Sequence, residues 1–283
     1  MDSLTPATSS QKEALLRRYG ATGLPALPDG GGPWNEVIAT MLDHRSVRGY
    51  KPDPVPTGTL ATMVAAAQSA ATSSNMQWTS VIAVSDPEKK KVLAEIAGNQ
   101  KHIEQCPLYL CWVADMTRNS GISGEQKVEF ETMPWLETFL VACIDVALAA
   151  QNAVVAAESL GLSTLYIGAM RNDPERVAAL LGLPKQSFVV FGLCVGYATV
   201  EAAGEVKPRL PQSVVVHHDR YHGDAKAAER KAYDGEMAQF AARHEMQAST
   251  WTQRVLNRLG PIKSMNGRER MRTALKALGF EVR

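Results

Sequence analysis

The chain has almost no excess of charge of either sign: 30 basic and 29 acidic side chains leave a formal net charge of +1 over 283 residues. Nucleic acids and anionic membranes favour partners with a strong basic excess, so we expect neither as the main partner. The balance is compatible with one small anionic ligand in a locally basic pocket. Small molecules are therefore the expected ligands.

Cysteine is scarce as well. The four cysteines form no Cys-x-x-Cys pair, and no histidine stands at metal-ligand spacing from them. Three of them sit in apolar strings, where cysteine behaves as a small hydrophobic residue. Neither a structural zinc site nor a disulfide framework is predicted. A reducing, cytoplasmic location fits this usage best.

Long hydrophobic runs are also lacking. A membrane-spanning helix needs about 18 consecutive apolar residues, and the longest candidate, 139–157, is interrupted by Asp145, Gln151 and Asn152. The first twenty residues are polar and lack the apolar core of a secretory signal. We interpret 139–157 as a buried helix of a soluble protein.

Several catalytic signatures are missing from the sequence. It has no Gly-x-Gly-x-x-Gly after a first strand, so a Rossmann dinucleotide site has no support. It also has no Walker-type loop for a nucleoside triphosphate and no Gly-x-Ser-x-Gly elbow of a hydrolase. His217, His218 and His222 lie close in sequence, but no carboxylate or cysteine completes a zinc-site spacing with them. A surface loop is the better interpretation of these histidines.

What is present predicts an N-terminal extension and linker over residues 1–33, followed by one domain over 34–283. Periodicity and capping residues, among them a capping box at Ser10-x-x-Glu13, predict helices over 10–20, 34–43, 57–71, 86–98, 136–160, 174–181, 225–243, 251–259 and 266–278. Strands are predicted over 78–84, 107–114, 163–167, 187–196 and 214–217. Residues 117–134 are predicted to be irregular and to act as a lid. Strands separated by long helices favour an α+β fold.

The segment from His44 to Tyr50, with the sequence HRSVRGY, is the clearest candidate for a binding site. Arg45 and Arg48 offer guanidinium forks and Ser46 a short hydroxyl donor, which together suit a phosphate group. Taken alone, the motif is more typical of an exposed basic helix end than of a phosphate site.

Other polar segments offer complementary groups. Lys207 and Arg209 flank a proline and present two further cations. Gly168, which follows a strand, permits a close backbone approach to a ligand. The remaining candidates are polar loop residues with donors for a flat ring: Thr72, Ser73, Ser74, Gln77 and Gln100. Taken alone, the segments around Gln100, Gly168 and Lys207 are more typical of ordinary loops or turns, and the serine loop is as typical of a simple polar connection.

Taken together, these segments resemble the FMN-binding nitroreductase family, in the branch of oxygen-insensitive NADPH nitroreductases and NADPH:FMN oxidoreductases. The matching strings occur in the family's order from about residue 34 onwards: HRSVRGY, ATSSNMQ, GNQKHIEQCP, AAQNAVVAAESLGLSTLYIGAMRN, FGLCVGYA and KPRLP. Six such strings in order are specific, although each alone is weak.

The resemblance implies a nitroreductase-like α+β fold with a central, mostly antiparallel sheet flanked by helices. It also implies an intertwined homodimer with two FMN molecules at the subunit interface. The flavin-binding residues that it implies are His44, Arg45, Ser46, Arg48, Thr72, Ser73, Ser74, Gln77, Gln100, Tyr166, Ile167, Gly168, Ala169, Lys207 and Arg209. NADPH or NADH would donate a hydride, and a nitroaromatic, a quinone or a flavin would accept the electrons in ping-pong turnover. A flavin reductase that supplies a partner monooxygenase and a non-catalytic flavin-binding protein are the alternatives.

The chain departs from the family at three places. Ala169 replaces a frequent glycine, and Asn75 replaces the aromatic that usually follows the serine loop. The loop before Trp251, which in this branch carries several arginines for the NADPH 2′-phosphate, keeps only Arg243. We therefore expect weak discrimination between NADPH and NADH, and we assign no acid–base catalyst, because the cofactor carries the chemistry.

Overall fold

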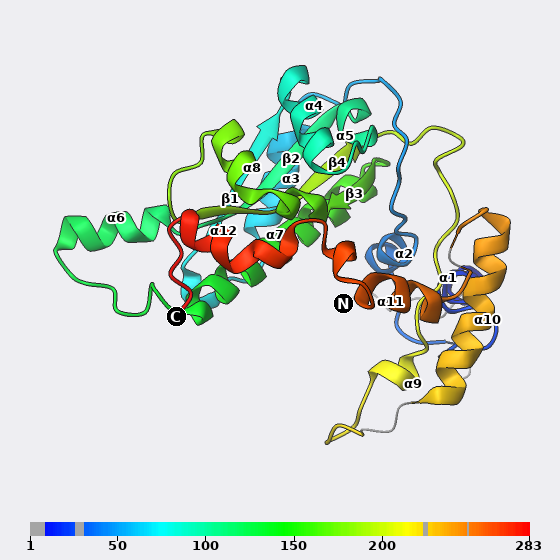
Figure 1. Ribbon diagram of the computed structural model, residues 1–283. Coiled ribbons are helices and arrows are strands. Elements are labelled where there is room, and N and C mark those ends of the chain that lie inside the picture. Colours follow the sequence, from blue (N-terminus) through cyan, green and yellow to red (C-terminus); the bar gives the residue numbers. More distant parts are fainter. Residues whose placement is uncertain (1–8, 26–30, 223–225, 248) are drawn as a thin grey trace, which may run out of the picture. The chain divides into compact units, whose positions relative to one another are not determined.

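The structure is a computed structural model of the chain and describes all residues except 1–8, 26–30, 223–225 and 248 (Figure 1). Much of the linker expected before residue 34 lies outside the described residues. The chain forms two compact units, one from residues 1–45 and 204–264, the other from 46–203 and 265–283. The sequence-based boundary at residue 34 stays a prediction, and each unit is described by itself.

The larger unit, 46–203 with 265–283, is built on a four-stranded sheet of order β1-β2-β4-β3. Every pair of neighbouring strands is antiparallel. The strands are β1 (Thr79–Val84), β2 (Leu108–Asp115), β3 (Ser163–Ile167) and β4 (Ser187–Gly196). The antiparallel sheet and the α+β class expected from the sequence are confirmed.

Both faces of this sheet are covered, which explains why its central strands are apolar throughout. Along β2, Leu110 and Trp112 pack into one hydrophobic cluster, whereas Tyr109 and Cys111 pack into the other. The first face is covered by α3 (Thr59–Gln68), α7 (Leu136–Ser159) and α12 (Met271–Ala277). The opposite face is covered by α4 (Pro87–Ile96), α5 (His102–Gln105) and α8 (Pro174–Leu181).

Helix α7 is long and apolar enough to cross a membrane by length and composition alone. Its buried residues, however, include Val146, Ala150 and Val154, which pack in the cluster on the first face of the sheet. Small alanine side chains let the helix lie close to β2 and α3. One face of this helix is thus buried in the core, as the sequence led us to expect.

The smaller unit, 1–45 with 204–264, is helical in its described part. Its helices are α1 (Ser9–Tyr19), α2 (Glu36–Leu42), α9 (Gln212–Val215), α10 (Ala227–Arg243) and α11 (Trp251–Leu259) (Figure 1). Tyr233, Met237 and Phe240 on α10 form its small core with Leu210 and Trp251. Asn35 caps α2 by accepting a hydrogen bond from the Ile38 amide at 3.0 Å.

Two local predictions are wrong for physical reasons. Residues 117–134, expected to be irregular, begin with helix α6 (Thr117–Gln126), whose first amide donates to Asp115 Oδ1 at 3.0 Å. Residues 214–217, expected as a strand, overlap the short helix α9, because the Val214 amide turns back to the Pro211 carbonyl.

Two further helices differ from expectation. Helix α5 was not predicted, and the C-terminal helix begins at Met271 rather than near residue 266. Short 3-10 turns complete the fold: η1 (Ser73–Asn75), η2 (Gly168–Asn172), η3 (Ile262–Met265) and η4 (Arg268–Arg270).

Candidate functional site

The segment from Ser46 to Tyr50 is pinned along strand β3 in the larger unit. The Val47 amide donates to the Thr164 carbonyl at 3.1 Å, and Ser46 forms a parallel bridge with the same residue. Val47 and Tyr50 are buried, and the Tyr50 hydroxyl donates to the Val47 carbonyl at 3.1 Å. The inward residues thus fix the backbone, while Ser46 and Arg48 face solvent.

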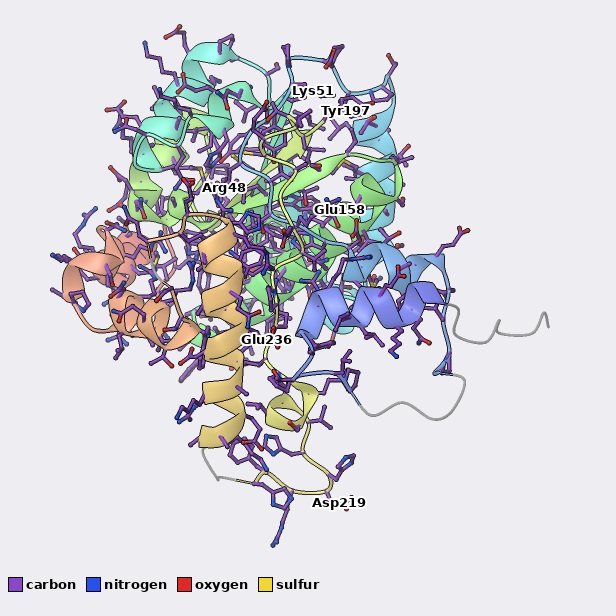
Figure 2. All side chains as sticks on the ribbon, turned by 90° about the vertical axis from the view of Figure 1, so that its right-hand side faces the viewer. Arg48, Lys51, Glu158, Tyr197, Asp219 and Glu236 are labelled. Atoms are coloured by element: carbon purple, nitrogen blue, oxygen red, sulfur yellow. The ribbon has the colours of Figure 1, made fainter. Side chains whose placement is uncertain are left out.

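Arg48, labelled in Figure 2, acts electrostatically on His102, two residues after Gln100. His102 links the two, because its Nε2 is 3.0 Å from Gln100 Oε1 and the positive charge of Arg48 acts on its ring. Burial, followed by that charge, lowers the pKa of His102 below its usual value. The structure thus brings together two predicted site residues, Arg48 and Gln100, around a histidine that the sequence did not single out.

Tyr166 and Ile167 end strand β3, and Gly168 and Ala169 begin η2. The Ile167 and Ala169 side chains are buried in the core, so only their backbone can face a ligand. Tyr166 packs edge-on against Phe191, with the two ring centroids 4.9 Å apart. The predicted contacts at this strand end are therefore backbone groups plus the Tyr166 ring.

The serine loop, residues 72–77, has different neighbours. The Ser73 amide donates to Asp145 Oδ1 on α7 at 3.0 Å, and Arg118 on α6 donates to the Gln77 carbonyl at 2.7 Å. Ser74, Asn75 and Gln77 all adopt left-handed backbone angles, with φ of 49°, 54° and 53°. Among the described residues, the hydrogen bonds of this loop lead to α6 and α7 rather than to Ser46, Arg48 or Gln100.

A pocket of about 740 Å³ opens beside the serine loop. Its walls are largely apolar and include Trp112, Ile122 and Phe130, while Gln77 and Asn119 add amide groups. Within the described residues, Trp112 Nε1 and Asn119 Oδ1 are buried without a hydrogen-bond partner. Apolar walls with a few polar groups suit a flat aromatic molecule.

Asp145 was noted in the sequence only as an interruption of an apolar run. Its side chain is buried, and within the described residues its Oδ2 has no hydrogen-bond partner. Burial raises the pKa of Asp145, and the hydrogen bond from the Ser73 amide opposes this effect. The Asp145 carboxylate thus holds the serine loop in place by accepting the hydrogen bond from the Ser73 amide.

The other predicted cations lie in the smaller unit. Arg45 pairs with Asp43 at 3.1 Å, and Arg209 donates to the Lys207 carbonyl at 3.3 Å. Lys207 Nζ lies 5.8 Å from the centre of the Phe240 ring, and the Arg243 guanidinium carbon lies 6.0 Å from it. The structure therefore gathers Lys207 and Arg243 around one aromatic side chain.

Arg243 also carries a partner that the sequence did not reveal. Glu205 Oε2 accepts hydrogen bonds from Arg243 at 3.1 and 2.9 Å and lies 3.7 Å from His244 Nε2. The hydrogen bond from Arg243 is the largest cause of a lowered pKa of Glu205. A pocket of about 490 Å³ in this unit is lined by Arg45, Glu205 and Arg243.

The donor groups fit a flavin phosphate. Arg48 has an exposed guanidinium whose hydrogen bond goes to a main-chain carbonyl, that of Ser46 at 3.3 Å, and the neighbouring serine adds a hydroxyl. The left-handed serine loop and the Gly168 turn add backbone groups that suit the polar edge of a flat ring. These residues supply the chemistry that FMN needs, namely cations for its phosphate and polar groups for its ring.

Comparison with known proteins agrees with this donor set. The sequence model of the Nitroreductase family matches residues 41–197, and that of the Nitroreductase family C-terminal domain matches residues 207–283. A NADPH-flavin oxidoreductase of Vibrio harveyi is 38% identical over 227 residues, which is 80% of this chain and 91% of the relative. An FMN reductase [NAD(P)H] of Bacillus subtilis is 41% identical over 209 residues, 73% of this chain and 83% of the relative.

The fold gives the same result. The solved structure of the NADPH:FMN oxidoreductase from Vibrio harveyi, complexed with NAD+, superposes with a TM-score of 0.78 at 34% identity, covering 88% of this chain and all of the other. The sheet, the matched segments and the identity over most of both chains lead to one assignment. The chain belongs to the nitroreductase family.

Proposed function

We propose that this protein is an FMN-dependent NAD(P)H oxidoreductase that reduces small electron-poor acceptors, such as nitroaromatics, quinones or free flavin. When bound, FMN accepts a hydride from the nicotinamide nucleotide and passes two electrons to the acceptor. The observation that carries the proposal is that Ser46 pairs with Thr164 near the start of β3, while Arg48 and Gln100 both act on His102, in a member of the nitroreductase family.

The chain's own residues would bind and orient the cofactor. Cationic side chains and one hydroxyl would bind the phosphate. The ring and the ribityl chain would be contacted by the serine-loop residues Thr72, Ser73, Ser74 and Gln77. The phosphate-binding set that we propose is His44, Arg45, Ser46, Arg48, Lys207 and Arg209. Charge-assisted hydrogen bonds contribute about 1.5–3 kcal/mol each, so a few of them would hold the cofactor firmly.

A homodimer would complete this arrangement. Within one chain the hydrogen bonds of the serine loop lead to α6 and α7, and a second copy would supply the other side of the ring in the homodimer that the family resemblance implies. Leu136, Leu140, Ile144 and Leu148 recur every four residues on α7 and are 43–57% exposed. Such an exposed apolar stripe favours burial against another copy.

Ile144→Glu on this stripe should convert the dimer to monomers, because a charge would be buried in an apolar interface. Sedimentation velocity measures the change, with Lys91→Glu on the exposed side of α4 as a control that should stay dimeric. A wild-type protein that sediments as a monomer at micromolar concentration would contradict the dimer.

A flavin reductase that supplies reduced FMN to a partner enzyme is the second candidate. It is favoured by the names of the Vibrio and Bacillus relatives, which describe flavin or FMN reduction. We also propose a cytoplasmic location, as the cysteine usage indicates.

Steady-state oxidation of NADPH and of NADH, each with a nitroaromatic, a quinone and free FMN, tests the function. If the protein binds FMN but supports no turnover with any pair, a non-catalytic flavin-binding role replaces the proposal.

A further inference from the structure

Helix α1 lies outside the segments matched by the family models, which begin at residue 41. It nevertheless packs into the smaller unit. Gln11, Ala14, Leu15 and Arg18 recur at helical spacing and are all buried, with Arg18 only 5% exposed. A buried arginine on an added helix requires a structural or functional reason, because burying its charge is costly without hydrogen bonds.

The Arg18 guanidinium donates to three main-chain carbonyls from two distant segments. Nη2 donates to Leu42 at 2.6 Å and to His44 at 2.9 Å, and Nη1 donates to Lys207 at 3.0 Å. In return, the Arg18 carbonyl accepts from the Arg209 amide at 2.8 Å. One residue thus holds together the segment before Ser46 and the segment 207–209.

Further contacts fasten the end of α1 to the rest of the smaller unit. Thr22 donates to Glu236 Oε1 on α10 from its hydroxyl at 3.0 Å and from its amide at 3.3 Å (Figure 2). Gln212 Nε2 donates to the Tyr19 hydroxyl at 3.4 Å. The helix is therefore anchored at its C-terminal end, where Arg18 lies.

The two segments that Arg18 joins carry His44, Lys207 and Arg209, which belong to the proposed phosphate-binding set. Fixing their backbones reduces the conformational entropy that is lost when an anion is gripped. The buried guanidinium also adds a permanent positive charge behind both segments, which favours an anion near them.

We propose that Arg18 is a positioning residue that preorganises the flavin-phosphate grip, and that the N-terminal helix thereby sets the preference for a phosphorylated flavin over an unphosphorylated one. This inference rests on the proposed FMN-dependent function. It assigns a role to a helix that the family match leaves outside.

The test is a fluorescence titration of the flavin-free full chain with FMN and, separately, with riboflavin, which lacks the phosphate. Arg18→Ala should weaken FMN binding on the order of tenfold, about 1.4 kcal/mol, and leave riboflavin binding within about twofold. Arg18→Lys keeps the charge but cannot reach three carbonyls, so it should lose part of the FMN affinity. Arg17→Ala is the matched control, since Arg17 is 52% exposed on the same helix and should change neither affinity.

Equal weakening of FMN and riboflavin in Arg18→Ala would overturn the inference, because it would show a general structural role. Unchanged FMN affinity would overturn it as well. If Arg18→Ala does not fold, Arg18→Lys decides by the same ratio of FMN to riboflavin affinity. If the wild-type protein does not bind FMN, the proposed function itself is contradicted. If the wild type binds FMN and the Arg18 variants keep the same preference for FMN over riboflavin, only this inference is contradicted.

Discussion

Glu205 holds Arg243, the last residue of α10, through two hydrogen bonds at 2.9 and 3.1 Å to one carboxylate oxygen. Arg243 is the single arginine left in the segment before Trp251 that the family resemblance associates with NADPH. Both side chains are about half exposed, so the pair is screened by water and adds little stability. If Arg243 binds the 2′-phosphate of NADPH, as the family resemblance implies, the Glu205 carboxylate competes with that phosphate for the same guanidinium. The pair gives a physical reason to expect weak discrimination between NADPH and NADH.

Glu205→Gln should therefore raise the preference for NADPH. The substitution removes a negative charge and leaves Arg243 available for a phosphate, so KM for NADPH should fall several-fold while KM for NADH changes little. Steady-state kinetics with one fixed acceptor measure both constants. Arg243→Ala in the Glu205→Gln background should abolish the gain; a gain that persists without Arg243 would contradict this explanation.

Arg48→Ala and Lys207→Ala should each release FMN. Each substitution removes one charge-assisted phosphate contact, and we expect affinity to fall by about tenfold or more per contact. The ratio of flavin to protein after gel filtration measures occupancy. Lys51→Ala, an exposed lysine near the motif, is the control that should retain FMN (Figure 2). Full occupancy in both variants would exclude the assigned phosphate site.

The proximity of Arg48 to His102 gives a titration that is independent of the cofactor. Arg48→Ala should raise the pKa of His102, because one of the two causes that lower it is removed while burial remains. NMR titration of the histidine ring protons in flavin-free protein measures this pKa. Arg45→Ala is the charge-matched control.

The same lowered pKa makes stability depend on pH with a defined sign. The folded chain keeps His102 neutral while the unfolded chain takes up a proton below its ordinary pKa of about 6.5, so the free energy of unfolding falls as pH drops below that value. His102→Gln should reduce the fall, as measured by urea denaturation between neutral and mildly acidic pH. An identical pH dependence in this variant would show that other groups cause it.

The fold should tolerate removal of the Asp145 charge but not removal of the oxygen that accepts the Ser73 hydrogen bond. Asp145→Asn keeps an oxygen for the Ser73 amide and removes a buried charge, so its stability should equal or exceed that of the wild type. Asp145→Ala leaves that amide without its partner and should cost about 1–3 kcal/mol. Urea denaturation of both variants measures the difference; equal destabilisation by both substitutions would contradict a role as acceptor.

Elements whose formation depends on neighbouring residues could be predicted from the sequence, whereas those that depend on contacts far along the chain could not. Strands β3 and β4 begin and end at the predicted residues, because each is an apolar run bounded by turn residues. Helix α6 was missed because two glycines lower its local helix propensity, whereas Arg118 anchors it to Asp115 and to the carbonyls of Gln77 and Thr79. The contacts with Gln77 and Thr79 are long-range and leave no periodic signal in the sequence.

The site shows the same limit. The motif around Arg48 was recognisable because its residue types suit a phosphate. His102, Glu205 and Arg18 were not, because each acts through a partner far away in the chain: Arg48, Arg243 and Lys207. A sequence motif identifies the groups that could contact a ligand. The residues that hold those groups in position or alter their electrostatics can be identified only from the folded structure.

Anaerobic stopped-flow reduction of the FMN-loaded protein tests the central claim most directly. We expect NADPH and NADH each to bleach the visible flavin absorbance in a single two-electron step, and a nitroaromatic or a quinone mixed in afterwards to restore it. A flavin that stays oxidised with both nucleotides, in protein that retains full FMN occupancy, would contradict the proposed oxidoreductase function.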